Sequence, residues 1–183
     1  DGDATVQLTE PAVIARVEEK LPGLRMVQAY GQTETSPILT ILNPEYHVFE
    51  GALAGKTKAA GQAIPGVELA IMDEEDQVLG TGEIGEVCAR GPNVMLGYWN
   101  LPEQTAETIR GGWIHTGDGG YMDEDGFLFI SDRVKDMIVS GGENVYPAEV
   151  ENVLYQHPAV AEAAVIGVPH PKWQEVGKAI IVV

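Results

Sequence analysis

A stretch of alternating apolar and polar residues limits the folds open to this chain more than any other feature. The segment "GVELAIMDEEDQVLGTGEIGEVCARG", residues 66–91, breaks its alternation at "DEEDQ" and at glycines. Successive side chains of a β-strand point to opposite faces, so this pattern predicts strands joined by turns. "GWIHTGDGGYMDEDGFLFISDR", residues 112–133, continues it as two strands around a "DEDG" turn. We expect antiparallel strands in a small barrel or twisted sheet.

Three other segments predict helices. Residues 9–23 carry apolar side chains at helical spacing and end at Pro-Gly. Residues 101–109, "LPEQTAETI", predict a short helix. Residues 146–158 predict an amphipathic helix with Pro147 in its first turn, and its apolar face is formed by Val150, Val153 and Leu154.

Further β-type runs complete a mixed α+β fold class. Residues 24–30 predict a short buried strand that leads into a polar loop, where open α/β sheets place ligands. Residues 160–169 and 177–183 are also β-type, and the chain stops inside the second run, so we expect a fragment of a longer protein. Residues 43–60 have the weakest pattern and predict a surface loop.

Charge and cysteine content narrow the classes of partner. The 183-residue chain has a formal net charge of −17, which opposes generic binding to nucleic acid or to an anionic membrane. No stretch approaches the roughly 20 apolar residues of a membrane span, and no leader pattern opens the chain. Cys88, the one cysteine, cannot form an internal disulfide, so we expect a cytoplasmic protein with Cys88 as a buried core residue.

A first polar cluster, "AYGQTETSP", spans residues 29–37. The hydroxyls of Thr33, Thr35 and Ser36 suit phosphate oxygens, Glu34 is a hard oxygen ligand suited to Mg²⁺, and Tyr30 offers a flat face to a ring. A polar turn that satisfies its own backbone explains the same residues, and for this cluster alone that reading is the stronger one.

Two later clusters change that balance. "HTGDGG", residues 115–120, sets Asp118 between glycines at an expected strand end, where a carboxylate can accept both hydroxyls of a ribose or can simply form a turn. "SDRVKDMIVSGGENVYPAEVE", residues 131–151, carries Arg133, whose guanidinium suits a ribose or phosphate. His115 is expected to be a structural residue at a strand end.

Taken in this order, the three clusters resemble the adenylate-forming superfamily of acyl- and aryl-CoA synthetases, luciferases and nonribosomal peptide adenylation domains. "YGQTETSP" is similar to its Tyr-Gly-x-Thr-Glu motif, and "GEIGEVCARGPNVMLGYWNLPEQT" to its Gly-Glu…Gly-Tyr-Trp segment. Residues 112–151 match the long signature that spans its two domains, and the resemblance covers essentially the whole chain.

The resemblance implies a role for each matching residue. Thr33 and Glu34 would be catalytic, with Thr33 on the phosphate and Glu34 on Mg²⁺. The remaining ATP- and AMP-binding residues would be Gln28, Ala29, Tyr30, Gly31, Asp118 and Arg133, with Tyr30 on the adenine and Asp118 and Arg133 on the ribose. Lys135 would be the hinge, and Gly141 and Gly142 would line the CoA tunnel. Gly2, Asp3 and Ala4 take the place of a Gly-Gly-Ala stretch at the nucleotide and acyl site.

The resemblance also implies the domain organisation and the reaction. Residues 1–131 would end a large α/β AMP-binding domain with a barrel-like subdomain, and residues 132–183 would start a small α+β C-terminal domain. The full enzyme would join a fatty or aryl acid to ATP and pass the acyl group to CoA; a carrier-protein-loading adenylation module is the alternative. The phosphate loop would precede Asp1 and the catalytic lysine would follow Val183, so we expect this chain alone to be inactive. A homodimer of the full-length enzyme is possible.

Overall fold

The computed structural model describes residues 14, 17, 19–133, 137–155 and 157–183, with the side chains of residues 132, 133, 144, 148, 149 and 152 left out. The chain divides into two compact units. The first ends at Ile130, and the second comprises Ser131–Val183 together with Gly117–Gly119. A division into compact units does not show which part of the chain folds independently. The predicted domain boundary between residues 131 and 132 therefore stays a prediction.

A small antiparallel sheet opens the first unit. Its strands are β1 (Gln28–Tyr30), β2 (Thr40–Leu42) and β3 (Gln62–Ala63), in the order β1-β2-β3. The predicted strand over residues 24–30 is too long, and Leu24 and Val27 are more than half exposed. Its pairing starts at Gln28 because the partner strand ends opposite it, at Leu42, just before Asn43-Pro44 turns the chain away.

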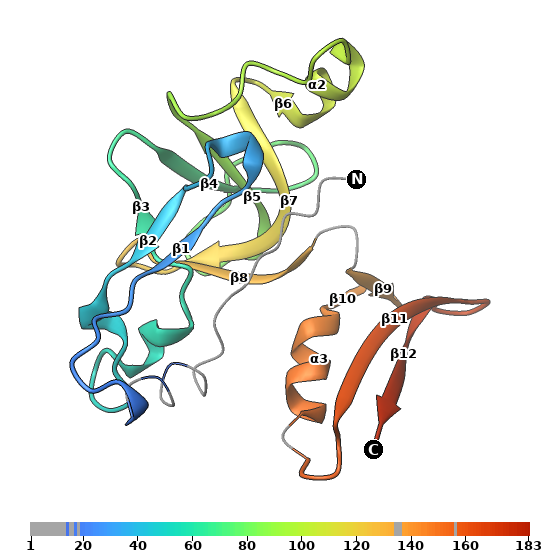
Figure 1. Cartoon of the computed structure of the whole chain (residues 1–183). Coiled ribbons are helices and arrows are strands. Elements are labelled where there is room, and N and C mark those ends of the chain that lie inside the picture. The colour runs from blue at the N-terminus through green and yellow to red at the C-terminus, as the bar shows by residue number, and fades with distance from the viewer. Residues whose placement is uncertain (1–13, 15–16, 18, 134–136, 156) are drawn as a thin grey trace. The chain divides into compact units, whose positions relative to one another are not determined.

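The larger sheet, most of which belongs to the first unit, confirms the antiparallel, curled sheet expected from the alternation (Figure 1). It comprises β4 (Glu68–Met72), β5 (Gly85–Arg90), β6 (Ile109–Arg110), β7 (Trp113–Met122) and β8 (Leu128–Arg133), in the order β4-β5-β7-β6 with β8 on β7. The short helix α2 (Pro102–Thr108) precedes β6, as predicted.

Both faces of strand β5 are buried. Val87 and Ala89 point into the main core, while Cys88 packs on the opposite face with Ala70 and Met72, and all three β5 residues are fully buried. A flat sheet with one solvated face would leave every second residue exposed. In the curled sheet each face of β5 therefore packs into its own apolar cluster.

Residues 43–60 are more ordered than the predicted surface loop. They form two short 3₁₀ helices, η2 (Pro44–Tyr46) and η3 (Ala54–Lys58). Thr57 is buried and donates its hydroxyl to the Val48 carbonyl at 2.7 Å, and Lys56 pairs with Asp123 and Asp125 in the β7–β8 turn. The prediction failed because these contacts are made by distant residues and leave no local periodicity.

Ala60 and Gly61 join the two sheets. The Ala60 N–H donates to the Leu128 carbonyl at 2.7 Å, and the Leu128 N–H donates to the Gly61 carbonyl at 2.8 Å. Gly61 has a φ of +110°, and a Cβ there would overlap the backbone of Ile41 and Leu42. Only glycine allows the two backbones to cross this closely.

The second unit packs one helix on an antiparallel sheet. Its strands are β9 (Ile138–Ser140), β10 (Glu143–Val145), β11 (Glu162–His170) and β12 (Gln174–Val182), in the order β10-β9-β12-β11. The helix α3 (Pro147–Leu154) lies along β11 (Figure 1), with Pro147 in its first turn as predicted. No helix in the described part of the chain combines the length and apolar character needed to cross a membrane.

The packing face of α3 differs from the predicted one. Glu151 lies on the packed side and accepts a hydrogen bond from the Val165 N–H at 2.6 Å. Val150 and Val153 remain 36% and 65% exposed, so the apolar face predicted from spacing is only partly covered within this chain.

Of the first predicted helix, residues 14, 17, 19 and 20 are described and helical; its proposed start lies outside the described residues, as do Gly2, Asp3 and Ala4.

We predict that Gly61→Ala lowers the free energy of unfolding by at least about 2 kcal/mol, because the added methyl group meets backbone and cannot be relieved by a rotamer change. Chemical denaturation monitored by tryptophan fluorescence measures the change. Gly55→Ala is the matched control, because a Cβ at Gly55 meets nothing within 4 Å. Equal stability of the two variants would contradict the role given to Gly61.

Candidate functional site

The turn from β1 into the 3₁₀ helix η1 (Thr33–Thr35) carries the first polar cluster. A Cβ at Gly31 would overlap the carbonyl oxygen of Pro37, so the close return of the chain requires glycine. The Leu39 N–H donates to the Tyr30 carbonyl at 2.7 Å and closes the loop. Residues 31–38 therefore form a compact projection from the strand.

The three residues of η1 have different roles. Thr35 is fully buried, and its hydroxyl donates to the Gln32 carbonyl at 2.8 Å and accepts from the Gln32 N–H at 3.1 Å. The Thr35 hydroxyl therefore stabilises the turn. It is not directed to a phosphate, although the residue type had suggested that role. Thr33 is exposed and Glu34 is half-buried, so these two can meet a ligand.

The Glu34 side chain is held by a distant segment. Tyr98 donates its hydroxyl to Glu34 Oε1 at 2.9 Å, and the Met95 N–H donates to the Glu34 carbonyl at 2.8 Å. Asn93 donates from Nδ2 to the carbonyls of Thr35 and Ile38, at 2.8 and 2.9 Å. Asn93, Met95 and Tyr98 lie in the segment that resembles the family's Gly-Glu…Gly-Tyr-Trp motif. The motif alone predicted no role for Asn93 or Tyr98.

The strand β1 presents little side-chain surface to a ligand. Tyr30 is 5% exposed and belongs to the main apolar core, so little of its ring is open to adenine in this chain. Gln28 is also buried, with Nε2 at 3.1 Å from Nε2 of His47. Ala29 lies on the exposed face between them.

Asp118 and Arg133 lie on β7 and β8, in the short parts of these strands that belong to the second unit. Asp118 is 1% exposed and lies inside the ten-residue strand β7, not at a strand end as predicted. β7 pairs with β5, β6 and β8, and the strand continues through the glycines. Arg133 is the last residue of β8, and Lys135 lies outside the described residues.

Gly141 and Gly142 form the two-residue turn between β9 and β10. Their φ angles are +63° and +90°, and Ser140 pairs with Glu143 across the turn. Tight hairpin turns of this kind favour glycine at both central positions. The Gly141 N–H donates to the Trp173 carbonyl at 2.9 Å, and the Trp173 ring occupies the space where a Gly141 side chain would lie. This geometry explains the glycine pair without a ligand.

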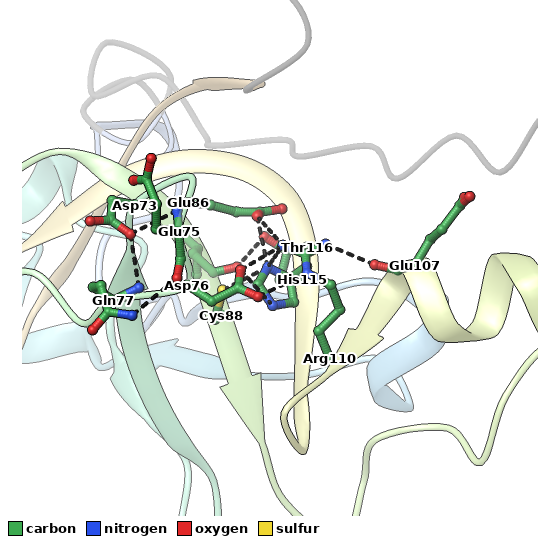
Figure 2. Close-up of polar contacts among 11 residues, drawn as sticks. Asp73, Glu75, Asp76, Gln77, Glu86, Cys88, Glu107, Arg110, His115 and Thr116 are labelled. Carbon is green, nitrogen blue, oxygen red and sulfur yellow. Dashed lines mark hydrogen bonds and ion pairs between the residues drawn. The ribbon is translucent and has the colours of Figure 1, made fainter.

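A buried polar cluster surrounds His115 (Figure 2). Its Nδ1 lies 2.8 Å from Glu86 Oε2, 2.8 Å from Arg110 Nη2 and 3.3 Å from Cys88 Sγ. Asp76 lies beyond, with Oδ1 at 2.8 Å from Arg110 Nη2. Glu86, Cys88 and His115 are residue types that can hold a metal ion, and one ligand atom of each lies within 4.8 Å of the others. The sequence does not reveal the contact between Cys88 and His115, because 27 positions separate the two residues.

The cluster is better explained as a structural ion-pair network than as a metal site. Arg110 already places a cation against His115 Nδ1 and pairs with Asp76. A second cation among the same atoms would be repelled by the guanidinium. His115 therefore has the structural role expected for it, although it lies within β7 and not at its end.

The Cys88 thiol has low reactivity in this cluster. Burial, and then the charge of Glu86, raise the pKa of the thiol to about 12. The thiolate is the reactive form of cysteine, and this environment disfavours it. The prediction that Cys88 is a buried core residue is confirmed.

Comparison with known proteins identifies the class. The family described as "AMP-binding enzyme" matches residues 8–99, and "AMP-binding enzyme C-terminal domain" matches residues 149–183. A fatty acid–[acyl-carrier-protein] ligase, ScoC, of Streptomyces coeruleorubidus is 49% identical over 97% of this chain and 34% of the ligase. The 2-succinylbenzoate–CoA ligase of Geobacillus kaustophilus is 48% identical over 88% of this chain and 32% of the ligase.

Solved structures give the same class. The o-succinylbenzoate CoA synthetase of Bacillus subtilis, in complex with the acyl-adenylate intermediate OSB-AMP, matches 93% of this chain and 34% of its own at a TM-score of 0.82 and 41% identity. The chain belongs to the adenylate-forming superfamily of AMP-binding enzymes. It spans about a third of the length of the relatives it matches.

We predict that Cys88 in the folded chain reacts with a thiol reagent at pH 8 at least a thousandfold more slowly than an exposed cysteine. A pKa near 12 instead of 9 lowers the thiolate fraction roughly a thousandfold, and burial slows access further. Absorbance of the released thiolate reports the rate.

The matched control is a Cys88→Ser, Thr81→Cys variant, because Thr81 lies in an exposed turn. The unfolded chain should also label rapidly through Cys88. Rapid labelling of Cys88 in the folded chain would contradict the packing described here.

Proposed function

We propose that the protein that carries this chain is an AMP-forming acyl-CoA ligase for a fatty or aromatic acid. It activates the carboxylate with ATP to an acyl-adenylate and then forms a CoA thioester. The observation that carries this proposal is the projecting Thr33-Glu34 pair, with the Glu34 carboxylate held by Tyr98, in a chain of the adenylate-forming superfamily. The ligase relatives named above support it.

Charge neutralisation is the main demand of the first step, because a carboxylate must approach a polyphosphate. In our proposal Thr33 contacts the phosphate and Glu34 binds Mg²⁺. The geometry fits these roles: the Thr33 side chain is exposed, and the half-buried Glu34 pairs with no Lys or Arg in the described part of the chain. A relative, the Bacillus subtilis synthetase, has been solved in complex with ATP and magnesium ion.

The remaining proposed roles fall on residues that match family motifs. Gln28, Ala29, Tyr30 and Gly31 form the wall beside the adenine in this proposal, with Ala29 as its exposed side chain. The proposed ribose ligands are Asp118 and Arg133, the proposed hinge is Lys135, and the proposed CoA loop is Gly141 and Gly142. These roles follow family motifs at the matching positions.

Transfer to a carrier protein is the second candidate function. The observation that favours it is the 49% identity to the fatty acid–[acyl-carrier-protein] ligase ScoC over 97% of this chain. The two functions share the adenylation step and differ only in the thiol that accepts the acyl group. A cytoplasmic location and a possible homodimer remain part of the proposal.

We predict that the full-length protein that carries this chain catalyses acid-dependent exchange of pyrophosphate into ATP with fatty or aryl acids. Glu34→Gln should lower the exchange rate at least roughly a hundredfold, because it removes the anionic ligand of Mg²⁺ and keeps the side-chain size. Radiolabelled pyrophosphate measures the exchange.

Glu50→Gln is the matched control, because Glu50 is an exposed glutamate outside the proposed site. The isolated 183-residue chain should show no exchange, because the resemblance places the phosphate loop and the catalytic lysine outside it. Exchange with amino acids alone would refute the proposed substrate class.

We predict further that CoA is the acceptor. With an acid that supports exchange, CoA should yield an acyl-CoA and release AMP, which chromatography with mass detection resolves. A phosphopantetheinylated acyl-carrier protein is offered in a parallel reaction. Acylation of the carrier protein without any acyl-CoA would establish the second candidate function in place of the first.

A further inference from the structure

We propose that Tyr98 is a positioning residue that orients the Glu34 carboxylate for a divalent cation, a role that rests on the function proposed above. It acts from residues 91–101, here called the clasp segment, which lies between β5 and α2. Tyr98 itself touches neither the substrate nor the metal in this proposal.

The clasp segment holds both the backbone and the side chain of the projecting turn. Asn93 and Met95 bind three carbonyl oxygens of the turn, those of Glu34, Thr35 and Ile38. Tyr98 binds the Glu34 carboxylate itself, through one oxygen, Oε1. The backbone contacts fix the place of Glu34, and the Tyr98 contact fixes the direction of its carboxylate.

The backbone of Tyr98 is itself held in place. The Tyr98 N–H donates to Thr105 Oγ1 at 2.9 Å, and the Thr105 hydroxyl donates to the Leu101 carbonyl at 2.9 Å. Thr105 lies on α2, so the backbone of the residue that carries the donor is anchored to a helix and not only to its own loop. This anchoring reduces the conformational freedom that the hydroxyl would otherwise lose on binding the carboxylate.

The chemistry of the contact suits a metal ligand. A phenol donates a hydrogen bond but brings no positive charge, so Glu34 keeps its full attraction for a cation. The bond occupies one carboxylate oxygen and leaves Oε2 for the cation, as outer hydrogen bonds to ligating carboxylates do.

A purely structural bond would stabilise the turn without affecting metal use, and the two roles predict different results. In the full-length protein, Tyr98→Phe should raise the Mg²⁺ concentration for half-maximal pyrophosphate exchange about tenfold or more, as losses of outer hydrogen bonds do. The KM for the acid and the melting temperature should change little. Tyr121→Phe is the matched control, because in the part of the chain that the structure describes the Tyr121 hydroxyl makes no hydrogen bond and its ring stacks on Phe129.

A double-variant comparison makes the test specific. In a Glu34→Gln background, Tyr98→Phe should cause no further rise in the Mg²⁺ requirement, because the carboxylate it orients is gone. Calorimetric titration of ATP at a series of Mg²⁺ concentrations gives the same comparison where exchange is too slow to measure.

Each other outcome has a definite meaning. An unchanged Mg²⁺ requirement in Tyr98→Phe, or an equal rise with and without Glu34, overturns the positioning role while the proposed function stands. Absence of exchange with every acid in the wild-type protein overturns the proposed function, and the role of Tyr98 with it.

Discussion

The first unit depends on the backbone crossing at Ala60 and Gly61, where the small sheet meets the large one. Two hydrogen bonds join these residues to Leu128, and Gly61 also lies against the Ile41 backbone, where a Cβ would not fit. Around this crossing a single apolar core takes Tyr30 and Leu39 from the region of the small sheet and Val87 and Ile114 from the large sheet. The strand that leads to Thr33 and Glu34 is thus anchored from both sides. A projecting polar turn can be stable because its base is part of the core.

Electrostatics explains why one carboxylate matters in so acidic a chain. Three cations of the first unit, Lys56, Arg90 and Arg110, are each paired with carboxylates of the same unit. They hold turns and strands together and are not available to balance a polyphosphate. In the proposed reaction Mg²⁺ supplies part of the positive charge, and a carboxylate oriented by a neutral phenol would help to hold it.

Most secondary-structure elements follow from local pattern. Alternation predicted β4, β5, β7 and β8, and a proline before a helical spacing predicted α2 and α3, because strand and helix periods are set by neighbouring residues. The strand over residues 24–30 came out too long, since its length depends on where the partner strand ends, at Leu42. The ordered 43–60 segment was missed for the same reason: Lys56 and Thr57 find their partners through the fold.

By itself the sequence determined the mixed class, the antiparallel strands and the superfamily, because these depend on periodicity and on short motifs with fixed spacing. It also singled out Glu34 by residue type. Only the tertiary structure decided that Thr35 turns inward, that Tyr30 is nearly buried, and that Cys88 lies beside His115. Above all, it brought Tyr98 to Glu34 across 64 positions. Contacts between residues so far apart are set by the packing of whole sheets and segments, and no local spacing encodes them.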